Sequence, residues 1–146
     1  MNISRDEAVL SLSRRVIDAR TVIICDPYIL NCKETETENY LTNLGTIFPP
    51  SLKSTLLIFD PNKFKAAMLS KLLEYFPDKN IKAQKCDDIH DRVWIINGNS
   101  AFTTGTSLNS IGYKLSFIQD LPVKDFNSFW DFLVDRVPEV VSYKVT

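Results

Sequence analysis

Two short apolar runs, each followed directly by Asp-Pro, constrain the fold more than any other feature of the chain. The runs span residues 21–25 and 56–59. Short runs of β-branched and other apolar residues that end at turn residues are typical of strands buried on both faces. Helical patterns precede, separate and follow the two runs. The chain therefore predicts an α/β fold with a central mixed sheet and helices on both faces.

Apolar residues at helical spacing define the expected helices. The spacing predicts helices over residues 5–19, 61–76 and 122–137, and a polar loop over 31–39 that leads into a short helix ending at Gly45. In the second of these helices, Asp60 serves as the N-cap. Its buried face is expected to carry residues spaced four apart, which are Phe64, Met68, Leu72 and Phe76.

The second half of the chain carries a hairpin signal. Residues 81–86 and 89–96 have strand patterns, and Asn97-Gly98 follows the second of them. Asn-Gly is the strongest short signal for a β-hairpin, so residues 100–106 should return antiparallel to the preceding strand. Residues 113–119 are expected to form a further strand.

Length and composition predict a soluble, cytoplasmic, single-domain protein over residues 1–146. The chain has 17 basic and 18 acidic residues, for a net charge of −1, so any surface that binds phosphate must be local. No apolar run approaches the ~20 residues of a membrane-spanning helix, and the start of the chain lacks a signal-peptide pattern. Cys25, Cys32 and Cys86 imply no disulfide framework, and their spacing with His90 is unusual for a zinc site. We therefore expect no metal and no cofactor.

The single histidine lies in a segment that suits phosphate chemistry. On a regular strand, His90 and Arg92 share one face with Trp94, about 7 Å apart. Arginine offers a fixed fork of donors to a phosphate, and histidine can attack phosphorus or move a proton. The alternative is a partly exposed strand on which His90 has no chemical role. This spacing alone leaves both interpretations open.

A longer pattern resembles the phospholipase D superfamily. His90-x-Arg92-x4-Asn97, followed by Gly105-Thr106-Ser107-Leu108-Asn109, is similar to the family motif H-x-K-x4-D followed by G-[ST]-x-N. The order of elements also resembles a single-motif phospholipase D-like domain. The resemblance implies a phospholipase D-like mixed β-sheet flanked by helices on both faces.

The resemblance also implies a site and a mechanism. Its catalytic residues would be His90, Arg92, Asn97, Ser107 and Asn109. Its phosphate ligands would be Arg92, Asn109, Lys114 and Tyr28, although Lys114 and Tyr28 also have ordinary structural interpretations. One histidine would attack phosphorus and a second would protonate the leaving oxygen, without a metal. A chain with one motif would therefore need a homodimer to complete the site.

The sequence departs from the motif at two positions. Arg92 keeps the positive charge of the family lysine, but Asn97 replaces a carboxylate that would stabilise the imidazolium. Asp91 points away from His90 if the strand is regular, whereas Asp87 or Asp88 would serve as a partner if the strand begins late.

Several functions remain open at this stage. The first is a metal-independent phosphodiesterase of the nuclease type. The second is a catalytically decayed module for dimerisation or for binding nucleic acid or membrane phospholipid; the string at residues 89–92 is also similar to a phospholipid-binding domain of the same superfamily. The third is a regulatory domain within a larger bacterial defence protein. The phosphodiester interpretations predict that His90, Arg92, Ser107 and Asn109 converge in one pocket at the sheet edge.

Overall fold

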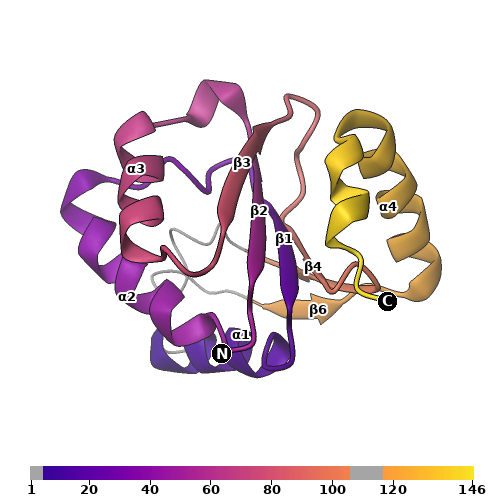
Figure 1. Cartoon of the computed structure of the whole chain (residues 1–146), viewed down its shortest axis with the longest axis horizontal. Coiled ribbons are helices and arrows are strands. Elements are labelled where there is room, and N and C mark those ends of the chain that lie inside the picture. Colours follow the sequence, from indigo (N-terminus) through magenta and orange to yellow (C-terminus); the bar gives the residue numbers. More distant parts are fainter. Residues whose placement is uncertain (1–4, 106–116) are drawn as a thin grey trace.

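The computed structural model describes residues 5–105 and 117–146, and within these ranges six strands form one mixed sheet (Figure 1). The strand order is β3-β2-β1-β4-β5-β6. The first three strands are parallel, and β4, β5 and β6 each run antiparallel to the strand before them in that order. The strands are β1 (Thr21–Cys25), β2 (Ser54–Phe59), β3 (Ile81–Lys85), β4 (Val93–Ile96), β5 (Ser100–Thr104) and β6 (Ile118–Asp120).

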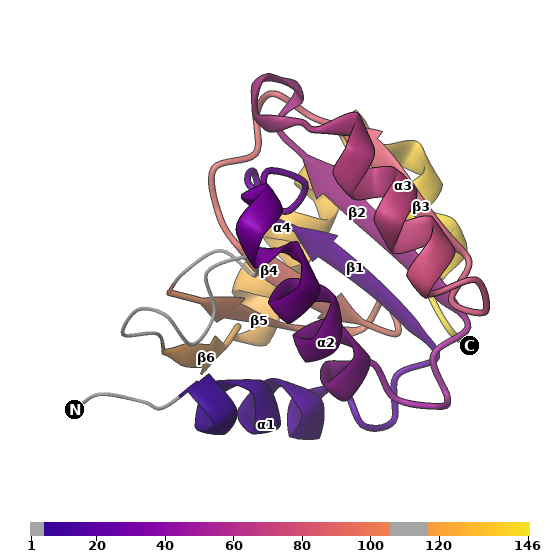
Figure 2. The same cartoon turned by 90° about the vertical axis from the view of Figure 1, so that its left-hand side faces the viewer.

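Helices cover both faces of the sheet, as the sequence predicts (Figures 1 and 2). On one face lie α1 (Arg5–Arg15), α2 (Thr37–Ile47) and α3 (Ala66–Tyr75). On the other lie α4 (Val123–Arg136) and the 3-10 helix η4 (Pro138–Tyr143). Successive side chains of β1 alternate between the two cores, because strand side chains point to opposite faces. No described helix is long and apolar enough to cross a membrane.

The region after β2 differs from the single helix expected over residues 61–76. The Asp60 side chain accepts a hydrogen bond from the Asn62 N–H at 2.9 Å and caps a short 3-10 helix, η2 (Pro61–Lys63). Phe64 and Lys65 are then extended, because the Lys65 N–H pairs with the Leu30 carbonyl at 2.9 Å. As a consequence, Phe64 is 39% exposed and does not lie on the buried face of α3, whereas Met68, Leu72 and Phe76 are buried as expected.

Two other helix ends also differ from their expected positions. The first helix ends at Arg15, four residues before the expected end. By contrast, α2 passes through Gly45 and ends at Ile47. Leu44 and Ile47 are both buried, so the apolar stripe of α2 continues beyond the glycine. A buried side chain after Gly45 thus outweighs the tendency of glycine to end a helix.

The strand expected over residues 89–96 begins only at Val93. Its neighbour β1 ends at Cys25, which lies opposite Val93, and Asp26-Pro27 then leaves the sheet. Residues 89–92 consequently have no partner strand on that side. His90 and Arg92 therefore precede the strand and do not share a strand face, contrary to the expectation from a regular strand.

The Asn97-Gly98 hairpin is confirmed, and it is a closely packed point of the fold. Both residues have positive φ, 56° and 71°, and β5 returns antiparallel to β4. A Cβ atom on Gly98 would lie 2.5 Å from the Cα atom of Lys144, so the turn also needs glycine because the backbone of the last residues passes so close. Part of the strand expected over residues 113–119 is β6; residues 113–116, like Thr106, lie outside the described residues.

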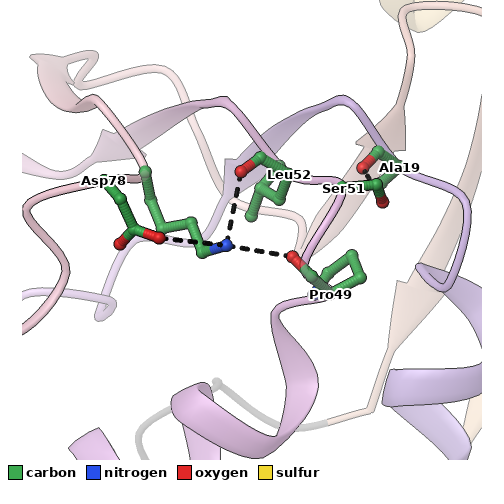
Figure 3. Close-up of polar contacts among 6 residues, drawn as sticks. Ala19, Pro49, Ser51, Leu52 and Asp78 are labelled. Carbon is green, nitrogen blue, oxygen red and sulfur yellow. Dashed lines mark hydrogen bonds and ion pairs between the residues drawn. The ribbon is translucent and has the colours of Figure 1, made fainter.

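A buried lysine closes the fold between α2 and β2. Lys79 is 8% exposed, and its ammonium group donates hydrogen bonds to the carbonyls of Pro49 at 3.0 Å and Leu52 at 3.4 Å. Asp78 lies 3.6 Å from the same group, as drawn in Figure 3. Ser51, also drawn in Figure 3, donates to the Ala19 carbonyl at 2.8 Å. These contacts fix the connection between α2 and β2.

Candidate functional site

One edge of the sheet gathers the side chains with the clearest ligand-binding chemistry. The parallel strands β1, β2 and β3 have their carboxyl ends there, and antiparallel β4 begins beside them, with Val93 opposite Cys25. The connections that follow β2 and β3 lie at this upper edge in Figure 2. In open α/β sheets, ligands bind in the crevice outside the carboxyl ends of the parallel strands. Tyr28, Lys63 and Arg92 come from three different connections at this edge.

The Tyr28 ring has two cationic groups near it. The Lys63 ammonium nitrogen is 5.4 Å from the centre of the Tyr28 ring, and the central carbon of the Arg92 guanidinium is 5.8 Å from it. These distances are within the range of cation–π attraction. All three side chains are half-buried. Two positive charges therefore lie within about 6 Å of the centre of one ring at the sheet edge.

The backbone around Tyr28 is fixed by hydrogen bonds. The Asp26 carboxylate accepts from the Tyr28 N–H at 2.9 Å, which closes the turn after β1. The Asp60 N–H donates to the Pro27 carbonyl at 3.2 Å and so ties the connection after β2 to the connection after β1. Arg92 is held in the same way, since its carbonyl accepts from the Thr104 N–H at 3.2 Å. The three side chains thus project from a rigid frame.

The described part of the chain supplies no ion-pair partner to the two cations of this cluster. Within residues 5–105 and 117–146, the buried Nε of Arg92 has no hydrogen-bond partner, and neither Arg92 nor Lys63 forms an ion pair. A buried donor without a partner is costly, and a charged acceptor is the strongest partner that a guanidinium can have. The arrangement is suited to an anionic oxygen such as that of a phosphate.

His90 lies near this cluster in sequence but in different surroundings. It is exposed in the connection between β3 and β4, and it lines an open pocket of about 190 Å³. The pocket is lined by His90, Asp88, Ile89, Asp91, Phe129 and Phe132. Among the described residues, the imidazole has no hydrogen-bond partner, whereas Asp88 accepts from the Arg136 side chain at 2.9 Å. The strand does begin late, which was the condition for Asp88 to approach His90.

The structure does not bring Asn97 to His90. All four residues of β4 lie between His90 and Asn97, a separation of roughly 13 Å or more along the strand. The Asn97 side-chain oxygen accepts from the N–H groups of Arg20 at 2.8 Å and Thr21 at 3.2 Å, at the start of β1. The backbone N–H of Asn97 donates to the Thr21 carbonyl, and the backbone carbonyl of Asn97 accepts from the Val145 N–H. Asn97 therefore holds the far end of the hairpin.

Three of the residues named from the sequence, Ser107, Asn109 and Lys114, lie outside the described residues. The described residues bring together Tyr28 and Arg92, two of the phosphate ligands expected from the resemblance. Lys63 was not expected. It follows β2 two residues after Asp60-Pro61, and Tyr28 follows β1 directly after Asp26-Pro27, so the repeated Asp-Pro pair was a signal for it.

Comparison with known proteins gives a fold but no family. No protein-family model matches the chain, and no curated protein matches it. Among solved structures, NucT from Helicobacter pylori superposes with a TM-score of 0.54 at 13% identity, covering 90% of this chain and 89% of that one. The archaeal chromatin protein TrmBL2, whose structure shows a mode of DNA binding, gives a TM-score of 0.49 at 10% identity over 93% of this chain. The present chain spans half the length of TrmBL2.

The molecule is thus a mixed α/β protein with helices on both faces of a six-stranded sheet. Its likeness to NucT extends over most of both chains and shows that the two proteins share this fold.

Proposed function

We propose that this protein binds phosphodiester groups of nucleic acid at the Tyr28, Lys63 and Arg92 cluster. The observation that carries the proposal is the pair of cations over one ring, with Arg92 Nε buried and without a hydrogen-bond partner among the described residues. The likeness to NucT, a nuclease of the phospholipase D superfamily, supports the same ligand class.

The two cations would bind a phosphate in different ways. The guanidinium of Arg92 offers a planar fork to two phosphate oxygens, and the ammonium of Lys63 acts as a compact point charge. Because the net charge is −1, no general positive field draws a polyanion to the protein. Affinity therefore depends on these local contacts, and removing either charge should be clearly measurable.

A binding assay with two ligands tests the proposal and separates its two phosphodiester sources. Fluorescence anisotropy with a labelled 15-nucleotide strand measures nucleic-acid binding, and co-sedimentation with phosphatidylglycerol vesicles measures lipid binding. We expect binding to the strand, weakened about ten-fold or more by Arg92→Ala and several-fold by Lys63→Ala, since charged hydrogen bonds contribute about 1.5–3 kcal/mol each. Lys53→Ala is the matched control, because Lys53 is exposed at the start of β2, at the opposite edge of the sheet.

Equal affinity of Arg92→Ala and Lys53→Ala for the strand would refute the proposal. Binding to vesicles alone would assign the cluster to a lipid head group.

A second candidate function is metal-independent phosphodiester cleavage by a homodimer. It is favoured by the exposed imidazole of His90, which has no partner among the described residues and lies in one pocket with Asp88. In this reaction an imidazole nitrogen would attack phosphorus, and the P–O bond to the leaving group would break. The leaving oxygen would take a proton from His90 of a second copy. Water would then attack the phosphorus and give a proton to the second imidazole, and the P–N bond would break to release the first imidazole.

Cleavage of a labelled strand in excess EDTA tests this second function. Wild-type protein should cleave without metal and should sediment as a dimer at tens of micromolar. His90→Ala should abolish cleavage but leave strand binding by the Arg92 cluster within about two-fold, because His90 and Arg92 have separate surroundings. Cleavage that appears only after a divalent metal is added would contradict the mechanism, and a monomer at these concentrations would contradict the homodimer.

A further inference from the structure

Phe64 is an exposed aromatic ring directly beside the phosphate cluster. It follows Lys63 in the chain and is 39% exposed. The ring stacks on Phe59, with centroids 4.8 Å apart and planes 27° from parallel. Phe59 is itself only 8% exposed, at the end of β2. The Phe64 ring is thus supported from beneath by a residue of the core.

The backbone under this ring is also fixed. Phe64 is extended, between the 3-10 helix η2 and the start of α3, and the Lys65 N–H pairs with the Leu30 carbonyl at 2.9 Å. A continuous helix over residues 61–76 would have turned Phe64 into the core. The break in the helix instead leaves part of a large apolar side chain in solvent, next to a cation that lies over Tyr28.

An ordered aromatic ring beside a phosphate site has an evident ligand. Nucleic-acid bases stack on exposed aromatic side chains, and every base has a face that can do so. A ring that is already held in place loses little conformational freedom on binding, which favours affinity. In a duplex the base faces are covered by their neighbours, so a base must first leave the stack, at a cost of about a few kcal/mol.

We propose that Phe64 is a base-stacking subsite, which makes unpaired nucleic acid the preferred ligand. One base of a single strand rests on the Phe64 ring while an adjacent phosphate contacts Lys63 and Arg92. This inference rests on the proposed function, because the phosphate cluster sets the position of the strand. It adds to that function a preference for strands with free bases.

The test compares three labelled ligands of equal length: a 15-nucleotide thymidine strand, an abasic strand with the same backbone, and a duplex. The variants are Phe64→Ala, Phe64→Trp and Tyr75→Ala. Tyr75 is the matched control, because it is 49% exposed on α3 and also contacts a neighbouring phenylalanine.

We expect wild-type protein to bind the thymidine strand more tightly than the abasic strand or the duplex. Phe64→Ala should weaken binding to the thymidine strand about ten-fold, within the range measured for loss of one stacked base. It should leave binding to the abasic strand unchanged, which also shows that the variant is folded. Phe64→Trp should retain wild-type affinity, and Tyr75→Ala should change the affinity for neither strand.

Three outcomes would overturn the inference while the phosphate cluster still stands. The first is equal binding of the thymidine and abasic strands by the wild type, and the second is equal weakening of both by Phe64→Ala. The third is wild-type binding to the duplex as tight as to the thymidine strand. If Arg92→Ala does not weaken binding to the abasic strand, the proposed phosphate site itself fails. The two failures are therefore distinguishable.

Discussion

The side-chain oxygen of Asn97 accepts two backbone hydrogen bonds, and this acceptor is what the fold needs at the end of β4. Aspartate supplies the same acceptor, so Asn97→Asp should keep the free energy of unfolding within about 0.5 kcal/mol. Asn97→Gly tolerates the positive φ but leaves two N–H groups without a partner, and it should lower that free energy by about 1–3 kcal/mol. Urea unfolding measures both values.

The same pair of variants tests whether Asn97 takes part in chemistry. Since Asn97 lies at the far end of β4 from His90, Asn97→Asp should not change any rate of phosphodiester cleavage. A clear increase in rate would show that the motif position acts on the histidine, and would contradict the geometry described above.

The buried phenol of Tyr40 should make the free energy of unfolding fall at alkaline pH. Its hydroxyl donates to the Ile29 carbonyl at 2.9 Å, and complete burial raises the pKa of the Tyr40 phenol well above 10, with Asp26 and Cys32 adding to the rise. The unfolded chain therefore releases this proton at lower pH than the folded chain. The stabilisation is fully present below about pH 10 and is lost as the pH rises from there toward the folded pKa.

Urea unfolding of the wild type and Tyr40→Phe from pH 8 to pH 11 checks this expectation. The free energy of unfolding should fall more steeply above pH 10 in the wild type than in the variant. Some slope should remain in the variant, because burial also raises the pKa of the Cys32 thiol and the Tyr143 phenol. Identical slopes would show that folding does not raise the pKa of the Tyr40 phenol.

At the level of elements, Lys79 joins the end of α2 to the sheet. Lys79→Met keeps most of the side-chain volume but removes the donors to the carbonyls of Pro49 and Leu52, both of which belong to buried residues. Hydrogen bonds from charged groups contribute about 1.5–3 kcal/mol, so we expect a loss of about 2–3 kcal/mol in the free energy of unfolding. Thermal and urea unfolding measure it.

Lys53→Met is the control for this variant, because Lys53 is exposed just before β2. It should change the free energy of unfolding by less than about 0.5 kcal/mol. Equal effects of the two substitutions would show that the contacts drawn in Figure 3 add nothing to stability.

Local sequence patterns predicted most elements, and contacts between elements set the remaining differences. The run over residues 21–25 is β1 to the residue, because a buried strand between two turn signals has little freedom. The start of β4 at Val93 depends on where β1 ends, and no pattern within residues 89–96 carries that information. The extended Phe64 likewise depends on pairing with Leu30, thirty-four residues earlier in the chain.

In the candidate site too, the sequence predicted some residues, whereas contacts between elements decided how they are arranged. Tyr28 and Arg92 were expected as ligands, but from a resemblance. The contact of the Arg92 guanidinium with the Tyr28 ring follows from the order β2-β1-β4 in the sheet, and so does the presence of Lys63 at that ring. Neighbouring strands bring three distant connections to one edge, and local sequence patterns do not predict this strand order.

For the whole molecule, the charge balance predicts a weak dependence of binding on salt. Each phosphate contact with single-stranded nucleic acid contributes about 0.7 to the slope of log affinity against log salt concentration. With contacts at Lys63 and Arg92 alone, the slope should be about −1.4, and Lys63→Ala should reduce its magnitude by about 0.7. Anisotropy titrations from 50 to about 300 mM salt measure it; a much steeper slope would require further basic residues in the interface.

The hairpin from Arg92 to Asn97 serves two tasks at its two ends. At Arg92 it contacts the Tyr28 ring, while at Asn97 it is tied to the start of β1 and to Val145. A pattern that scores all its positions as one catalytic unit would count an asparagine at the second end as decay. In this protein Asn97 holds the backbone at that end through its side-chain oxygen, so substitutions at the two ends of the segment should have separable effects.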